Sequence, residues 1–133
     1  MNWVRVRLVF EAYHHVALAV HDLGQARAFY GGLLGLEELD RPGEFGTQGA
    51  WFRLGRSELH MFEQRDYRPQ REMPGPHFAL RCLDFDATVE KLSAAGCEFL
   101  YGPGRDSAGV ARVLVDDPTG NTIELTDAAL HDA

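Results

Sequence analysis

The stretch His15-Val-Ala-Leu-Ala-Val-His-Asp22 recurs 62 residues later as His77-Phe-Ala-Leu-Arg-Cys-Leu-Asp84. The first histidine, the alanine, the leucine and the final aspartate stand at the same places in both stretches. Such internal repetition indicates two copies of one folding unit, because a period of about 60 residues in only two copies is too long for a solenoid. The sequence therefore predicts two fused copies of a single supersecondary unit.

Each copy begins with the same series of features. A short apolar run has the length of a buried strand, and an aspartate can accept hydrogen bonds from the first turn of a helix. Apolar residues then recur at helical spacing, and a glycine predicts the end of the helix. In chain order these features are residues 16–20, Asp22, residues 26–33 and Gly35, and then residues 78–83, Asp84, residues 85–95 and Gly96.

Three short strand-like segments follow each predicted helix. They are residues 36–39, 50–54 and 58–62 in the first half, and residues 98–101, 111–115 and 122–125 in the second. Turn-forming residues separate them, including Gly102-Pro103-Gly104 and Asp117-Pro118-Thr119-Gly120-Asn121, which we expect to be loop connections. Each half therefore has the order β-α-β-β-β, and we predict an α+β fold of two tandem β-α-β-β-β modules.

The length of 133 residues is typical of one domain. We predict a single domain over residues 1–133, with module one at about 12–66 and module two at about 75–127. The Pro- and Arg-rich stretch 67–76 is the predicted boundary between them. Two cysteines are too few for a disulfide framework in a chain of this size.

The composition restricts the class of partner. The formal net charge of −7 argues against nucleic acid, because phosphate binding requires clustered Lys and Arg. No apolar run is long enough for a signal peptide or a membrane span, so no membrane partner is expected and a cytoplasmic location follows by default. A small-molecule substrate or ligand is the expected partner.

Side chains that can bind metals stand at matching places in the two halves. His15 and His77 open the first predicted strand of each half, whereas His60 and Glu124 lie in the last, at separations of 45 and 47 residues. A pseudo-twofold arrangement would bring these two pairs together. Three imidazoles and one carboxylate suit a divalent ion of Fe, Mn, Ni, Zn or Co. We therefore predict that His15, His60, His77 and Glu124 bind one divalent metal ion.

The fourth ligand position is open between two residues. Alternate side chains share one face of an extended strand, so Glu58 and His60 point the same way and either could reach an ion. Without His60, two histidines and one carboxylate would leave several positions free for water or substrate. His14 is expected on the opposite face from His15, and therefore outside the site.

Together these motifs resemble the vicinal oxygen chelate superfamily, which includes glyoxalase I, extradiol dioxygenases and bleomycin-resistance proteins. The resemblance covers about residues 12–127 and is carried by His14–Asp22 with Ala28-Phe29-Tyr30 and Leu34-Gly35-Leu36, by Pro76–Leu80 and by Asp117–Leu125. It implies the glyoxalase/bleomycin resistance/dihydroxybiphenyl dioxygenase fold, in which the two modules form a curved mixed-sheet cup around a metal. It also implies metal binding at His15, His77 and Glu124, with the fourth position at Glu58 or His60.

The resemblance further implies a metal-dependent enzyme acting on a small polar substrate that chelates the ion. A lyase or isomerase of the glyoxalase I type is favoured over an extradiol dioxygenase, with Glu124 or Glu58 as the proton carrier. The alternative is a non-enzymatic protein of the resistance type that sequesters a small molecule. The candidate substrate-binding residues are Arg53, Arg112, Trp51 and Phe62. Related proteins often form homodimers, and the site could form within one chain or across two.

Overall fold

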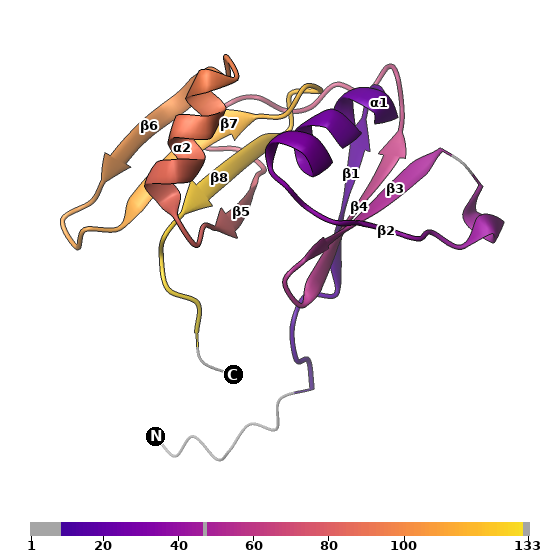
Figure 1. Ribbon diagram of the computed structural model, residues 1–133, viewed down its shortest axis with the longest axis horizontal. Helices are drawn as coiled ribbons and strands as arrows, with labels where there is room; N and C mark the ends of the chain where they lie inside the picture. Colours follow the sequence, from indigo (N-terminus) through magenta and orange to yellow (C-terminus); the bar gives the residue numbers. More distant parts are fainter. Residues whose placement is uncertain (1–8, 47, 132–133) are drawn as a thin grey trace.

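The computed structural model describes residues 9–46 and 48–131. The strands form two four-stranded sheets, one from each half of the chain, in the orders β1-β4-β3-β2 and β5-β8-β7-β6. In each sheet the first strand of the module runs parallel to its last strand, and the other pairings are antiparallel. Figure 1 shows the two sheets beside one another, each with its own helix. The predicted α+β fold of two tandem β-α-β-β-β modules is confirmed.

The elements of the two modules follow the predicted order. In module one they are β1 (His15–Val20), α1 (Leu23–Ala26), the π-helical segment η1 (Arg27–Leu33), β2 (Glu38–Leu39), the 3₁₀ turn η2 (Gly43–Phe45), β3 (Gly49–Leu54) and β4 (Ser57–Glu63). In module two they are β5 (Phe78–Arg81), α2 (Phe85–Ala94), β6 (Phe99–Arg105), β7 (Ala111–Asp116) and β8 (Thr122–Thr126). The parts of the chain that the structure describes contain no helix able to cross a membrane.

Both predicted helix starts and both predicted helix stops are confirmed. The Asp22 carboxylate accepts a 2.8 Å hydrogen bond from a backbone N–H in the first turn of α1, and the Asp84 carboxylate accepts one of 3.0 Å in α2. Gly35 and Gly96, just beyond the helices, have φ angles of +74° and +85°. This left-handed conformation favours glycine, so the chain leaves each helix where the sequence predicts.

The loop expected at Gly102-Pro103-Gly104 was wrong, because these residues lie inside β6. The pairing of β6 with β7 shifts register on both sides of Tyr101, and such bulges absorb turn-forming residues without ending a strand. Gly102 has φ +76°, and a Cβ atom there would lie 2.7 Å from the Arg112 carbonyl oxygen. Glycine therefore lets β6 continue through a bend that the sequence suggests is a turn.

Buried apolar side chains from both modules form one core. Its largest fully buried members include Tyr30, Phe52 and Leu59 from module one and Ile123 and Leu125 from module two. In β4, Leu59 and Met61 face this core and alternate with His60. In β8, Ile123 and Leu125 face the core on either side of Glu124, as the sequence predicts. The opposite faces of the two sheets therefore carry the polar side chains.

The turn between β7 and β8 ties the two modules together through buried polar groups. Its Asp117 accepts a 2.6 Å hydrogen bond from the Tyr30 hydroxyl of η1. The Asn121 side-chain amide donates to the Ala19 carbonyl of β1 at 2.9 Å. Burial, together with the charge of Asp117, raises the pKa of Tyr30 far above its ordinary value. These contacts fix the module-two turn against the module-one helix and strand.

Candidate metal centre

The polar face of the first sheet brings the predicted ligands of module one together. The parallel pairing of β1 with β4 sets Ala17 opposite His60, and the antiparallel pairing of β3 with β4 sets Trp51 on the other side of His60. The His60 ring stacks on the rings of His15 and Trp51, and its centroid lies 4.0 Å from that of His15 and 4.1 Å from that of Trp51. His15 and His60 are therefore adjacent imidazoles on one face of the sheet.

Glu58 lies on the same face of the first sheet as His60 and contacts it. The His60 Nε2 atom and the Glu58 carboxylate are 2.8 Å apart. This hydrogen bond holds the pKa of Glu58 below its ordinary value. Glu58 and His60 thus share one face of β4, as the sequence predicts, and their side chains form a hydrogen bond with each other.

The placement expected for His14 was wrong. Its Nδ1 atom lies 2.9 Å from the Nδ1 atom of His15, and its ring packs edge-on against the His15 ring at 5.2 Å. Strand β1 begins at His15, so the alternation that would send His14 to the opposite face does not reach it. Two adjacent histidines therefore meet at the start of β1.

Module two holds the second predicted pair. The His77 Nε2 atom lies 3.6 Å from the Glu124 Oε1 atom. The other ring nitrogen, Nδ1, lies 2.9 Å from the carbonyl oxygen of Gly75. Because a carbonyl can only accept, Nδ1 of the neutral ring carries the proton and Nε2 is free to bind a cation. A zinc-type ion holds such atoms at about 2.0–2.2 Å, so two of its ligands lie about 3–3.5 Å apart. The pair fits one edge of a metal site.

The strand registers make His60 the counterpart of Glu124. The residue two positions after His15 is Ala17, which pairs with His60. The residue two positions after His77 is Ala79, which pairs with Glu124. The same register step from each opening histidine therefore leads to His60 in one module and to Glu124 in the other.

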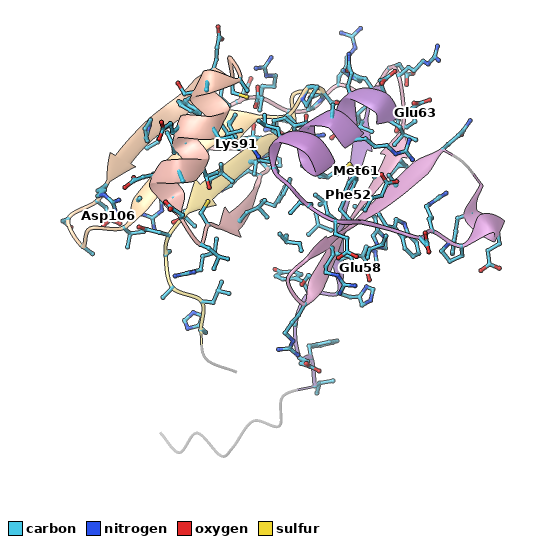
Figure 2. The ribbon with its side chains drawn as sticks, viewed as in Figure 1. Phe52, Glu58, Met61, Glu63, Lys91 and Asp106 are labelled. Atoms are coloured by element: carbon cyan, nitrogen blue, oxygen red, sulfur yellow. The ribbon has the colours of Figure 1, made fainter. Side chains whose placement is uncertain are left out.

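The two pairs do not meet within one chain. Across residues 9–46 and 48–131, no three His, Cys, Asp or Glu side chains are arranged to hold a metal ion. Figure 2 shows Glu58 in the right-hand half of the view, whereas β8, which carries Glu124, lies in the left-hand half. The structure thus presents two half-sites, one for each module.

The four candidate substrate-binding residues divide between these half-sites. Arg112 donates to Asp106 at 2.7 Å and has its Nε atom 3.7 Å from Glu124. Arg53 pairs with Glu37 at 3.1 Å, although its register position is directly across from Glu58. Trp51 lies across from His60 on β3, and Phe62 follows His60 by two residues along β4, so both share the face of His60.

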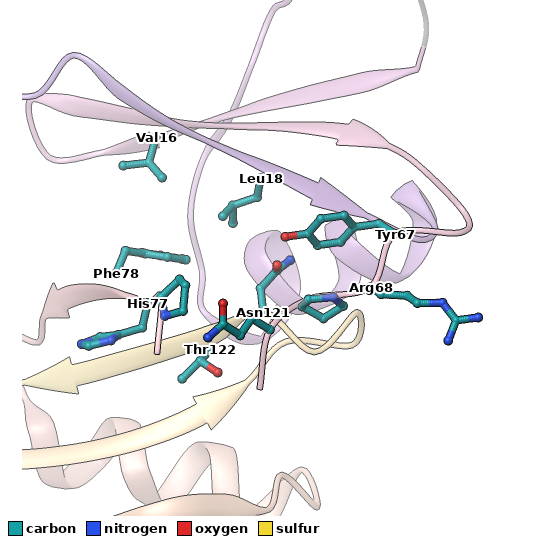
Figure 3. A pocket seen from close by; sticks show the side chains of 11 residues that line it. Val16, Leu18, Tyr67, Arg68, His77, Phe78, Asn121 and Thr122 are labelled. Atoms are coloured by element: carbon teal, nitrogen blue, oxygen red, sulfur yellow. The ribbon is translucent and has the colours of Figure 1, made fainter. Parts of the chain in front are cut away.

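A cavity of about 400 Å³ lies between the modules beside His77. Val16, Leu18 and Phe78 form apolar walls, and residues of the linker between the modules also line it. Figure 3 shows the Tyr67 ring along one side with its hydroxyl directed toward Leu18, while the Arg68 side chain extends away. The four candidate substrate-binding residues lie outside this lining.

The profile of the Glyoxalase/Bleomycin resistance protein/Dioxygenase superfamily matches residues 12–125. The chain belongs to this superfamily. A putative glyoxalase family protein from Bacillus anthracis has 31% identity and a TM-score of 0.77, over 91% of this chain and 98% of that one. A glyoxalase/dioxygenase from Nostoc punctiforme has 25% identity and a TM-score of 0.77, over 95% and 97%. A lactoylglutathione lyase from Agrobacterium tumefaciens has 29% identity and a TM-score of 0.68, over 90% and 95%.

Membership of the glyoxalase superfamily confirms the family predicted from the repeated histidine strands and the closing Asp117–Leu125 segment. Members of this superfamily typically use a divalent metal, bind small molecules and often dimerise. The imidazole and carboxylate donors of this chain fit such a metal by their chemistry. In the described part of the chain the four donors stand as two separate pairs.

Three contacts around the candidate residues of this glyoxalase-superfamily protein were not predictable from the sequence. They are the bond from His77 to the Gly75 carbonyl, the contact of His14 with His15, and the anchoring of Arg112 by Asp106. The first involves a backbone atom, which no residue type reveals. The doublet His14-His15 was a visible signal for the second. The third depends on the turn that follows β6 at Asp106, whereas the sequence predicts a turn earlier, at Gly102-Pro103-Gly104.

Proposed function

We propose that this superfamily member is a metal-dependent enzyme of the vicinal oxygen chelate type, a lyase or isomerase related to glyoxalase I. His15, His60, His77 and Glu124 would hold one divalent ion of Fe, Mn, Ni, Zn or Co. The supporting observation is the His77–Glu124 pair, with 3.6 Å between Nε2 and Oε1 and with the His77 proton fixed on Nδ1 by a carbonyl. A free imidazole nitrogen beside a carboxylate is an arrangement that such ions bind.

The side chains of the two half-sites suit a small polar substrate with two neighbouring oxygens. When bound, the ion would stabilise negative charge on those oxygens. Glu124 would carry a proton to or from the substrate, since its carboxylate lies within the half-site. Arg112, beside Glu124, would offer a positive charge to an anionic group of the substrate. Trp51 and Phe62 would supply an apolar wall. The similarity to a lactoylglutathione lyase supports lyase chemistry over ring-cleaving oxidation.

We also propose that each complete centre is built from two chains. Within the described part of one chain, β1 pairs only with β4 and β5 pairs only with β8, so an edge strand borders each half-site. A second copy related by a twofold axis can place its module two against module one of the first copy. The same contact then repeats on the other side, because a twofold interface is self-complementary. Such a homodimer would hold two centres.

Elemental analysis tests the metal. Protein purified without chelators or an affinity metal is expected to contain about one divalent ion per chain, as a four-ligand site implies. His77→Ala should lose the ion, because it removes one of the prearranged ligands. His131→Ala, in the exposed segment after β8, is the matched control and should keep it. Wild-type protein that takes up none of the five metals would contradict the proposal.

A mixing experiment tests the two-chain centre. One variant carries His15→Ala and His60→Ala, and a second carries His77→Ala and Glu124→Ala, so neither binds metal alone. In a mixed dimer one of the two centres combines intact halves from both chains. Random mixing should therefore restore about a quarter of the wild-type metal capacity. If the mixture stays as metal-free as its components, the centre does not form across two chains.

A substrate screen tests the reaction. Hemithioacetals of 2-oxoaldehydes are the expected substrates, and Glu124→Gln should abolish their turnover because an amide cannot carry the proton. Turnover of catechols alone would replace the lyase assignment with a dioxygenase. Tight binding of a small molecule by metal-free protein, with no turnover, would favour the sequestering function.

A further inference from the structure

The cavity between the modules has a size that suits a small ligand. Its volume of about 400 Å³ lies within the range of ligand pockets in proteins. None of the four candidate substrate-binding residues lines it, and of the candidate metal ligands only His77 does. The proposed function therefore leaves this cavity unused.

Contacts on two sides fix the linker where it lines the cavity. The His21 Nε2 atom donates to the Tyr67 carbonyl at 2.6 Å, and the His21 backbone N–H donates to the Thr119 hydroxyl at 2.8 Å. Further along the linker, Arg71 pairs with Asp116 of β7. The linker is thus tied to the turn after β1 and to the end of β7. The walls of the cavity are preformed, so a ligand would lose little free energy in ordering them.

Apolar and aromatic side chains form much of the lining. Val16 and Leu18 contribute aliphatic side chains from β1, and Figure 3 shows Phe78 and Tyr67 on opposite sides of them. Aromatic rings gain from packing against other rings in offset or edge-to-face arrangements. These walls therefore suit a molecule with a single aromatic ring.

The lining offers little charge to a ligand. Arg68 is the one permanently charged residue among the described residues that line the cavity, and its side chain extends away in Figure 3. His77 also lines it, but its Nδ1 atom is already bonded to the Gly75 carbonyl. An anion entering the cavity would lose hydration without gaining a cation in return. A neutral ligand is therefore favoured.

One polar atom of the lining has no protein partner. The Asn121 side chain lines the cavity, the residue is 8% exposed, and its amide nitrogen donates to the Ala19 carbonyl and to Asp117. Its Oδ1 atom receives no hydrogen bond from the residues that the structure describes. Among those residues, the fully sealed side-chain atom without a partner is Arg41 Nε, so Asn121 Oδ1 is accessible. An amide oxygen only accepts hydrogen bonds, so a ligand must bring the donor.

We propose that this cavity binds a neutral molecule with one aromatic ring and an O–H or N–H donor. The ring would lie between Tyr67 and Phe78, and the donor would bond to Asn121 Oδ1. A phenol has this chemistry. The ligand would contact both modules, because Leu18 belongs to the first and Phe78 to the second. The site goes beyond the proposed function, since it requires neither a metal nor a second chain.

Titration with p-cresol tests the site in the full-length protein at pH 8 with a chelator present. Nuclear magnetic resonance of the backbone amides should show saturable shifts at the lining residues, with a Kd on the order of 1 mM for a ligand of this size. 4-Methylanisole has the same ring but no O–H, and it should bind about 3–10-fold more weakly, the usual effect of losing one hydrogen bond. The anion p-toluate should cause no saturable shifts.

Two variants that fill the cavity test its location. Leu18→Trp and Val16→Phe each add bulk where the walls face the cavity, and both should abolish binding of p-cresol. Arg68→Ala is the matched control, because this linker side chain extends away from the cavity, and it should bind as the wild type does. Melting curves show which variants fold. If neither filling variant folds, the positions of the shifted amides in the wild type decide.

Each outcome supports or overturns a stated part of the inference. The site is wrong if p-cresol causes no saturable shifts, if the shifts lie away from the lining, or if a folded filling variant binds as well as the wild type. Equal affinity for p-cresol and 4-methylanisole overturns the bond to Asn121, and binding of p-toluate overturns the preference for neutral ligands. Because a chelator is present, these results do not depend on the metal centre, which elemental analysis tests separately.

Discussion

At the scale of single residues, Asp117 shows how one carboxylate can serve two modules. Its Oδ1 atom accepts hydrogen bonds from the backbone N–H groups of Thr119, Gly120 and Asn121, which shapes the turn after β7. Its Oδ2 atom accepts from Tyr30, which belongs to the other module. A buried carboxylate with several donors is stable only while these donors remain.

Tyr30→Phe should therefore destabilise the protein with little change in shape. The substitution removes a hydrogen bond to a charged group from a fully buried ring, which costs about 1.5–3 kcal/mol. Urea denaturation should show this loss in the free energy of unfolding. Tyr13→Phe, on an exposed ring, should change it by less than about 0.5 kcal/mol. Equal stability of both variants would mean that the Asp117 contact contributes nothing.

The raised pKa of Tyr30 also predicts an alkaline effect. Its ordinary value is 10.0, and the folded state holds the proton more tightly. The stabilisation is fully present below pH 10 and is lost above it, because the unfolded chain releases the proton first. The free energy of unfolding should fall by up to about 1.4 kcal/mol per pH unit above pH 10, beyond any fall in Tyr30→Phe. Parallel pH profiles of the two proteins would contradict this prediction.

The sequence reveals the identity of candidate ligands better than their surroundings. His15, His77 and Glu124 stand out because the repeat marks them, and the structure places His15 in β1, Glu124 in β8 and His77 directly before β5. The choice between Glu58 and His60 needs the pairing of β1 with β4, which alternation alone does not supply. The position of His14 depends on where β1 begins, and a boundary of one residue decides it.

At the scale of elements, the features that depend on local chemistry were predictable and those that depend on neighbours were not. Asp22 and Asp84 cap their helices because a carboxylate satisfies free N–H groups within three residues. The strand β6 passes through Gly102-Pro103-Gly104 because β7 lies alongside and pairs with it. The partner strand thus overrides a local turn signal.

The cap of α2 gives a prediction for this scale. Asp84→Ala removes the carboxylate that accepts from the first turn, and it should lower the free energy of unfolding by about 1 kcal/mol. Asp84→Asn keeps an acceptor oxygen and should lie within a few tenths of a kcal/mol of the wild type. Thermal melting of the three proteins checks this order. If alanine and asparagine behave alike, the capping bond carries no stability.

At the scale of the whole molecule, the repeat predicts two similar modules but not which modules face each other. The same β-α-β-β-β pattern suits a cup closed within one chain or between two. In the structure, the His15–His60 pair and the His77–Glu124 pair lie in separate half-sites. How they meet depends on surfaces spread over both sheets, and no short sequence pattern encodes such a contact.

A centre shared between two chains predicts that metal and association are linked. If Co²⁺ binds only where two copies meet, then adding it must tighten the dimer by mass action. Sedimentation of dilute protein should show a larger dimer fraction with Co²⁺ than with a chelator. His77→Ala should show no such change. If the dimer fraction of the wild type is the same with and without Co²⁺, the centre lies within one chain.

The hydrogen bonds from Tyr30 to Asp117 and from Asn121 to Ala19 cross between the halves without using the linker around Arg68. The covalent linker is thus not the only connection between the two modules. A protease that nicks the linker would leave two fragments still associated through the shared core and these bonds. The gene could be cut at the same place, and its two products could reassemble as a complementing pair.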